Sequence, residues 1–279
     1  MNIFELIKVG SNQLKERRIS SHILDSELLL SKALKKSREE ILINFEQKIS
    51  EKEITEYKKY LDRRSKHEPI AYILEEKEFW SKKFKVNKKT LIPRPDTEIL
   101  VEKILQMFKN KKISILDIGT GSGCIIVSLL DNLKRSNGIG IDVSKDAILL
   151  AKKNANRLIK QNRLKLINHS FENIFNRKFD LIISNPPYIK RKEIKNLSDD
   201  IKRYEPIIAL DGGNDGLDLI KKIIYKAKDI LKTKGTLALE IGNEQINKVS
   251  KILFDNNFRV KEIIKDYKNN VRCVIASYN

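Results

Sequence analysis

This chain of 279 residues has few of the residues that build metal centres and disulfide frameworks, and it lacks long apolar runs. Its two cysteines and three histidines are scattered without the close spacing that zinc ligands show. Its apolar runs fall short of the roughly 18 residues of a membrane-spanning helix. Its first ten residues, MNIFELIKVG, lack the pattern of a secretory signal. We therefore expect a soluble, cytoplasmic protein with no metal and no membrane partner.

Acidic residues are also outnumbered. The 56 Lys and Arg exceed the 37 Asp and Glu and give a formal net charge of +19. A groove that binds nucleic acid concentrates basic residues on one face or segment. Here the lysine excess is spread along the chain. We interpret it as background charge that adds electrostatic steering, and we consider a direct nucleic-acid substrate the weaker hypothesis.

The first seventy residues contain almost no glycine and no strand-like run. Apolar residues recur there at three- and four-residue spacing, as in amphipathic helices, over 2–18, 21–37 and 51–67. Ser21 and Ser50 stand where helix N-caps are expected. The pattern predicts a small all-α helical bundle over residues 1–74. The aromatic and β-branched stretch 69–93 predicts a two-stranded connection, and we assign residues 75–92 to a β-hairpin linker.

From residue 93 onward, short apolar strands alternate with helices. We predict strands over 113–119, 138–144, 164–170, 179–185, 236–242, 258–266 and 270–279, and helices over 96–110, 124–135, 145–161, 216–235 and 243–257. This alternation is typical of a parallel sheet covered on both faces. The turn before the last strand is too short for a crossover, so that strand is antiparallel. Residues 93–279 are thus predicted to form an α/β domain with a Rossmann-like, seven-stranded, mostly parallel sheet and an antiparallel C-terminal strand.

A glycine-rich loop separates the first strand of this domain from its helix. Its residues are Gly119, Thr120, Gly121, Ser122 and Gly123. Glycine lets the backbone turn tightly and approach a ligand closely, and the following helix N-terminus adds its donors. The loop fits a dinucleotide, S-adenosylmethionine, or only a tight strand-to-helix turn.

Two carboxylates stand near this loop. Asp117, at the end of the first strand, would accept from a ligand's ammonium group or cap the loop. Asp142 ends the second strand, where a carboxylate takes both hydroxyls of a ribose in adenosine-binding α/β folds. The alternative for Asp142 is helix capping, although Ser144 is better placed for that.

The run FDLIISNPPYIK, residues 179–190, ends a buried strand with Asn185, Pro186, Pro187 and Tyr188. In an open α/β sheet the ligand crevice lies at the carboxyl ends of the strands. Prolines have no N–H, so this loop presents carbonyls without competing donors. The carbonyls of the Asn185 side chain and the Pro186 backbone would accept both hydrogens of a planar amine or amide nitrogen, with Tyr188 stacked on its plane. The structural alternative is a strand-ending turn with a packed tyrosine.

These motifs resemble those of class I S-adenosylmethionine-dependent methyltransferases with an Asn-Pro-Pro-Tyr motif. Together with PIAYILEEKEFW, LIPRPDTE, YEPIIALDGGNDGLD and DYKNNVRCV, they make the chain similar to the peptide chain release factor glutamine methyltransferases, the HemK/PrmC family. The resemblance covers nearly the whole chain. It implies methyl transfer from S-adenosylmethionine, as co-substrate and without a metal, to the glutamine nitrogen in the Gly-Gly-Gln loop of release factors. It also implies that the helical domain binds the release factor, and we expect a monomer.

The resemblance also implies roles for individual residues. Asn185, Pro186 and Tyr188 would be catalytic, and Pro187 would join them in binding substrate. The cofactor would contact the loop 119–123, Asp142 and Asn185. Three further residues of LIPRPDTE would lie beside the cofactor pocket, namely Arg94, Thr97 and Glu98; helix capping by Asp96 or Thr97 is the alternative.

Two positions depart from the family pattern. Glu75 stands where the family tends to have glycine. After the third strand, where the family usually has an acidic-aromatic pair, the chain reads His169, Ser170 and Phe171. Counting back from Asn185 without gaps puts Ser170 at the aromatic position, whereas a one-residue shift puts Phe171 there. Either residue would contact the adenine.

Three other functions compete with this interpretation. The same motif would hold the exocyclic amine of a DNA or RNA base, and the basic chain would suit that substrate. An NAD-dependent oxidoreductase would use the glycine loop but leaves residues 185–188 unexplained. A non-enzymatic RNA- or ribosome-binding protein would retain the pocket only as a vestige, with no catalytic function. The match of the helical domain and the flanking segments favours glutamine methylation.

Overall fold

The computed structural model describes residues 1–159, 162–174 and 177–279. The chain divides into two compact units, Met1–Glu76 with Ser198–Tyr204, and Lys77–Leu197 with Glu205–Asn279. The sequence order does not predict the first grouping, because helix α9 (Asp199–Tyr204) comes from the middle of the later segment. Within its unit, the Tyr204 hydroxyl donates to the Lys66 carbonyl at 2.9 Å. No helix in the described ranges is long and apolar enough to cross a membrane.

The N-terminal unit is helical, as predicted. Its helices are α1 (Ile3–Glu16), α2 (His22–Leu34), α3 (Arg38–Ile43), α4 (Glu51–Ser65), α5 (Ile70–Leu74) and α9. Ser50 is confirmed as the N-cap of α4, where it forms a capping box with Glu53. Ser21 also stands at the N-cap of α2, as expected, but its side chain makes no capping hydrogen bond; its hydroxyl donates instead to the Asp25 carboxylate at 2.8 Å.

The stretch 69–93 is only partly a two-stranded connection. Residues 70–74 form α5 instead of extended chain, and the strands are limited to β1 (Glu76–Phe79) and β2 (Lys82–Lys85). Pro69 stands at the N-cap of α5 and Glu75 at its C-cap. Glu75 has a φ of +64°, the left-handed conformation that favours glycine at a helix end. This backbone conformation would favour glycine at position 75.

The second unit is built on a seven-stranded sheet, as predicted. Its order is β5-β4-β3-β6-β7-β9-β8, with all neighbours parallel except β9, which is antiparallel to both β7 and β8. The strands are β3 (Ser114–Ile118), β4 (Asn137–Asp142), β5 (Leu164–Asn168), β6 (Phe179–Ser184), β7 (Leu231–Glu240), β8 (Phe258–Lys265) and β9 (Val271–Tyr278). The strand order reverses between β3 and β6, which creates a crevice at their carboxyl ends.

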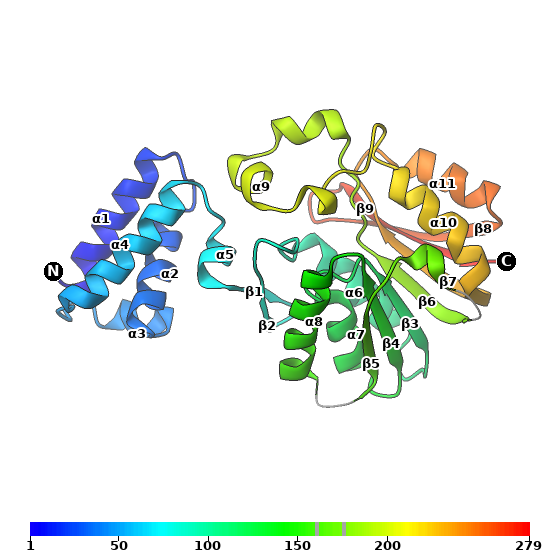
Figure 1. The fold of residues 1–279 in the computed structure, drawn as a ribbon, viewed down its shortest axis with the longest axis horizontal. Coiled ribbons are helices and arrows are strands. Elements are labelled where there is room, and N and C mark those ends of the chain that lie inside the picture. Colours follow the sequence, from blue (N-terminus) through cyan, green and yellow to red (C-terminus); the bar gives the residue numbers. More distant parts are fainter. Residues whose placement is uncertain (160–161, 175–176) are drawn as a thin grey trace. The chain divides into compact units, whose positions relative to one another are not determined.

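Helices cover both faces of this sheet (Figure 1). One face packs against α6 (Asp96–Met107), α7 (Cys124–Asn132) and α8 (Lys145–Leu158), and the other against α10 (Asp218–Ile230) and α11 (Ile246–Asp255). Both faces of the sheet are apolar because successive side chains of a strand point to opposite faces. In β6, Leu181 and Ile183 pack in the core on the side of α6, α7 and α8, and Ile182 packs in the core on the side of α10 and α11. The last two residues of the helix predicted over 145–161 lie outside the described residues.

Candidate active site

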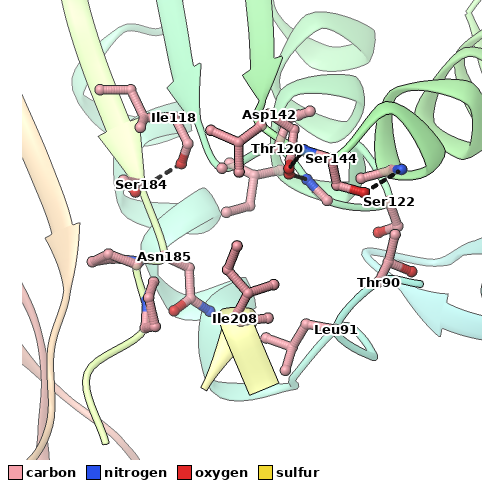
Figure 2. Close-up of a pocket in the computed structure, with 18 of the residues that line it drawn as sticks. Thr90, Leu91, Ile118, Thr120, Ser122, Asp142, Ser144, Ser184, Asn185 and Ile208 are labelled. Atoms are coloured by element: carbon pink, nitrogen blue, oxygen red, sulfur yellow. Dashed lines mark hydrogen bonds between the residues drawn. The ribbon is translucent and has the colours of Figure 1, made fainter. Parts of the chain in front are cut away.

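A cavity of about 270 Å³ lies at the carboxyl ends of β3, β4 and β6. These are the strands on either side of the point where the strand order reverses. Figure 2 shows Asn185 at one side of this cavity and Thr120 and Asp142 across from it, and Ile208 and Leu91 also line the cavity. The Ser184 hydroxyl donates to the Ile118 carbonyl at 2.7 Å and holds the ends of β6 and β3 together.

Most of the predicted site residues line this cavity. They are Gly119, Thr120, Gly121, Ser122, Asp142, Phe171, Asn185, Pro186 and Pro187, together with Arg94 and Thr97. Gly123, Ser170, Tyr188 and Glu98 are outside its lining. Residues from both LIPRPDTE and YEPIIAL also line it, which places the family-like segments at the same site as the glycine loop.

The glycine loop needs glycine for conformational reasons. Gly119, Gly121 and Gly123 have φ values of +70°, +54° and +82°, which L side chains rarely adopt. No atom lies within 4 Å of a Cβ built on Gly119, so this part of the loop has open space beside it. Gly123 also allows close helix packing. A Cβ atom built on it would be 3.3 Å from the Cβ of Ala151, where α7 packs against α8. The loop therefore combines a tight turn with close helix packing.

Asp142 fixes the loop from the end of β4. Its carboxylate accepts from the backbone N–H of Gly121 at 3.0 Å and from that of Ser144 at 2.9 Å. Ser144 is the N-cap of α8, as its position in the sequence indicates, and accepts from Ala147 N. Burial raises the pKa of Asp142, and the two N–H donors oppose that rise. Each carboxylate oxygen keeps a further lone pair that could accept another hydrogen bond without loss of these two.

Asp117 is fully buried beneath the loop. Its Oδ2 accepts from the Thr120 hydroxyl at 2.6 Å, whereas Oδ1 has no hydrogen-bond partner among the described residues. Burial raises the pKa of Asp117 to about 7, with a further contribution from the charge of Asp142. A buried carboxylate oxygen without a partner is costly. The loop-capping alternative is observed through Oδ2, whereas Asp117 is outside the lining of the cavity, so its contact with a ligand's ammonium group stays a prediction.

Asn185 and Pro186 present acceptors at the end of β6. The Asn185 Nδ2 donates to the Thr97 hydroxyl at 3.1 Å. Among the residues that the structure describes, none donates a hydrogen bond to Asn185 Oδ1 or to the Pro186 carbonyl. Two unengaged carbonyl oxygens therefore lie on adjacent residues of a loop whose prolines supply no N–H.

Tyr188 has a contact that the sequence does not reveal. Its hydroxyl donates to Glu240 Oε1 at 3.2 Å, and Thr97 donates to Oε2 of the same carboxylate at 2.6 Å. Glu240, at the end of β7, is 1 % exposed, and burial raises its pKa to about 7. An acidic residue inside the apolar run TLALEIG is the sequence signal that would have identified it, because a buried carboxylate requires partners.

The segment 210–216 braces the Asn-Pro-Pro-Tyr loop. Gly212 N donates to the Ile189 carbonyl at 2.8 Å, and Ile189 N donates to the Leu210 carbonyl at 3.1 Å. The Gln245 amide donates to the carbonyls of Tyr188 and Gly216 at 2.9 and 3.1 Å. The glycines of this segment therefore let one backbone pack directly on another.

Two acids anchor the LIPRPDTE segment, and Glu205 is the buried one. Arg94 forms an ion pair with Glu205 at 2.7 Å, and Glu205 also accepts from Ile92 N at 3.3 Å. Glu98 accepts from the Trp80 backbone N–H at 3.1 Å and ties α6 to the β1–β2 hairpin. Arg94 and Glu98 thus position the walls of the site, and Glu205 was not identified from the sequence.

The positions after β5 divide between the cavity and its rim. Phe171 and His169 both line the cavity, and Phe171 is 6 % exposed. The Ser170 side chain accepts from Glu172 N and caps a short 3-10 turn (Phe171–Asn173). Of the two residues considered for the adenine contact, Phe171 is the one in the cavity lining. Within the described ranges, no group of three His, Cys, Asp or Glu side chains could hold a metal ion.

Comparison with known proteins covers both units. Residues 5–74 match the family described as PrmC N-terminal domain, and residues 95–202 match the methyltransferase small domain. A release factor glutamine methyltransferase of Clostridium acetobutylicum is 41% identical over 280 residues, with 99% of this chain and 98% of the relative covered. One of Buchnera aphidicola subsp. Acyrthosiphon pisum is 42% identical, with the same coverage of both chains.

A solved structure supports the fold. The crystal structure of a methyltransferase from Pyrococcus furiosus superimposes with a TM-score of 0.53 and 20% identity, covering 70% of this chain and 87% of that one. At this identity the likeness concerns the fold alone. It confirms the predicted methyltransferase architecture of the second unit.

Proposed function

Because this chain belongs to the release factor glutamine methyltransferase family, we propose that it methylates the side-chain nitrogen of a glutamine in release factors, with S-adenosylmethionine as co-substrate. By resemblance, the glutamine is that of the Gly-Gly-Gln loop. The observation that carries the proposal is the pair of unengaged carbonyls, Asn185 Oδ1 and Pro186 O, beside the glycine loop. Two adjacent acceptors match the two hydrogens of an amide NH₂ group.

The residues of the cavity fit S-adenosylmethionine. When bound, this co-substrate supplies an electrophilic methyl group on a sulfonium. The glycine loop would let the backbone approach it closely, Asp142 would accept from the ribose hydroxyls, and Phe171 would pack against the adenine. The unpartnered Oδ1 of Asp117 would accept from the ammonium group, which explains a buried carboxylate oxygen that lacks a protein donor. No metal has a role in this proposal.

In this reaction the residues of the site mainly orient the substrate's amide nitrogen, and proton transfer is less important. An amide nitrogen is a poor nucleophile because its lone pair is delocalised. Hydrogen bonds from both N–H groups to Asn185 and Pro186 would raise electron density on nitrogen and fix its direction, with Tyr188 and Pro187 packed against the amide plane. Placement of reacting atoms at roughly 3 Å supplies much of the acceleration. The methylated nitrogen becomes acidic and loses its proton afterwards, so no strong base is needed beforehand.

We further propose that the N-terminal helical domain, over residues 1–74, binds the release factor, and that the enzyme acts as a monomer in the cytoplasm, where release factors work. The match of residues 5–74 to a domain found in this family supports the first statement.

Transfer of a labelled methyl group tests the substrate. The purified chain is incubated with labelled S-adenosylmethionine and an intact release factor, the same factor with its glutamine replaced, bulk RNA or bulk DNA. Label on the intact factor alone supports the proposal. Label on nucleic acid would keep the amine-holding chemistry and overturn the substrate, because an exocyclic base amine offers the same planar NH₂ group.

A further inference from the structure

Four side chains form one hydrogen-bonded line beneath the Asn-Pro-Pro-Tyr loop. Asn185 donates to Thr97, Thr97 donates to Glu240, and Tyr188 donates to the other oxygen of Glu240. These residues come from the loop after β6, the first turn of α6 and the end of β7. Thr97 is 2 % exposed and Glu240 is 1 % exposed, so water cannot readily replace either partner.

The direction of each hydrogen bond follows from donor and acceptor capacity. The Thr97 hydroxyl has a single hydrogen, and the Glu240 carboxylate takes it at 2.6 Å. The Thr97 oxygen then offers only lone pairs to Asn185. The NH₂ end of the Asn185 amide must meet that oxygen, at 3.1 Å, and the carbonyl end is left for the cavity.

This order matters because an asparagine amide can rotate by half a turn with little change of shape. In the rotated state its NH₂ group would face the NH₂ group of a bound amide substrate, and two donors would oppose each other. The ionised carboxylate of Glu240 is suited to prevent the rotation, because it accepts from Thr97 and Tyr188 together. A glutamine at the same place would offer one acceptor and one donor.

We propose that Thr97 and Glu240 are positioning residues, which hold the Asn185 amide with its carbonyl oxygen toward the substrate. The inference rests on the proposed function, since it presumes that Asn185 accepts from the substrate's NH₂ group. Thr97 would thus orient Asn185 in addition to lining the cofactor pocket, and Glu240 would support the reaction by orienting Thr97.

Two substitutions of Thr97 separate its hydroxyl from its shape. Thr97→Val keeps the shape and removes the hydroxyl, and we expect kcat to fall by about 10- to 100-fold, the range typical for groups that orient a functional side chain. Dissociation constants for S-adenosylmethionine should stay within about threefold. Thr97→Ser keeps the hydroxyl and should recover most of the lost rate. Full kcat in the valine variant would show that the hydroxyl has no part, and a serine variant as slow as the valine variant would show that keeping the hydroxyl does not restore the rate; either result would overturn the inference.

A double-mutant cycle with Asn185 then tests whether Thr97 acts through it. If it does, adding Thr97→Val to Asn185→Ala lowers kcat by less than about threefold further, because the group to be oriented is already gone. Losses that multiply would contradict the inference. Wild-type turnover by Asn185→Ala alone would instead overturn the proposed function, so the two failures are distinguishable.

A stability control completes the experiment. Ser128→Ala removes another buried hydroxyl, on α7, which has no hydrogen-bond partner among the described residues, and it should leave kcat unchanged. If Thr97→Val does not fold, Thr97→Ala removes the same hydroxyl without placing a second methyl group against Glu240, and the same cycle applies to it.

Discussion

Gly216 lies directly against the backbone carbonyl of Tyr188. A Cβ atom built on Gly216 would be 2.4 Å from that oxygen, and the φ of the glycine is +76°. Gly212 is similarly close, with its Cβ position 2.8 Å from the Pro187 carbonyl. The glycines of the DGGNDGLD segment therefore bring its backbone against the Asn-Pro-Pro-Tyr loop and set where the loop's carbonyls stand.

Gly216→Ala should displace this loop. The added methyl group conflicts with a backbone atom and also strains a positive φ, so we expect a loss of about 1–3 kcal/mol in the free energy of unfolding. Methyl transfer should fall by about 10- to 100-fold, since a shift of about 1 Å at reacting groups has that effect. Gly138→Ala is the matched control, because its Cβ would meet the end of the flexible Ile126 side chain at 2.7 Å, away from the cavity. Full transfer by Gly216→Ala would contradict the bracing role.

Glu75→Gly should stabilise the N-terminal unit. Glu75 is exposed and holds a φ of +64°, which costs an L residue about 1–2 kcal/mol and glycine almost nothing. Part of that gain is lost to the greater freedom of glycine in the unfolded chain, so we expect a net gain of about 0.5–1 kcal/mol. Glu75→Ala keeps the Cβ and removes the carboxylate, and it should show no such gain. Chemical denaturation of the three chains measures the difference.

Asp142→Ala should weaken S-adenosylmethionine binding more than it slows transfer at saturating co-substrate. It removes the carboxylate that we propose for the ribose and also the acceptor of Gly121 N and Ser144 N. Loss of hydrogen bonds to a charged group, at about 1.5–3 kcal/mol, corresponds to about 10- to 100-fold in the dissociation constant. Isothermal titration calorimetry measures it. Asp146→Asn, an exposed change in the first turn of α8, serves as control; equal affinity of Asp142→Ala and the control would refute the ribose contact.

Stability should depend on pH through Glu240. Burial raises the pKa of this carboxyl from 4.5 to about 7, against the opposing hydrogen bonds from Thr97 and Tyr188. Between these values the folded chain holds a proton that the unfolded chain has lost, so the free energy of unfolding falls as pH rises from 4.5 to about 7. The fall is about 3 kcal/mol at most. Glu240→Gln lacks this titration and should show a shallower decline. Asp117 titrates in the same direction in both chains, so parallel profiles would contradict the assignment to Glu240.

Sequence reasoning succeeded where the signal is local. The glycine loop, Asp142 and the Asn-Pro-Pro-Tyr run are each contiguous, and the order of strands and helices predicts the sheet that brings them to one edge. The links between them are not local. Thr97 meets Asn185 across 88 positions and Glu240 across 143, and no periodicity reports such a pair. The helical turn at residues 70–74 was missed because aromatic and β-branched residues there are buried for tertiary reasons, which outweigh strand propensity.

The central claim is that the carbonyl of Asn185 holds the substrate nitrogen and has little part in holding the co-substrate. Asn185→Ala tests it through two quantities measured on the same preparation, the rate of methyl transfer to a release factor and the dissociation constant for S-adenosylmethionine. We predict a loss of about 100- to 1000-fold in kcat, the range seen when one oriented group is removed from an active site. The dissociation constant should change by less than about threefold. Turnover like that of the unaltered chain, or a rate loss that saturating S-adenosylmethionine restores, would contradict the claim.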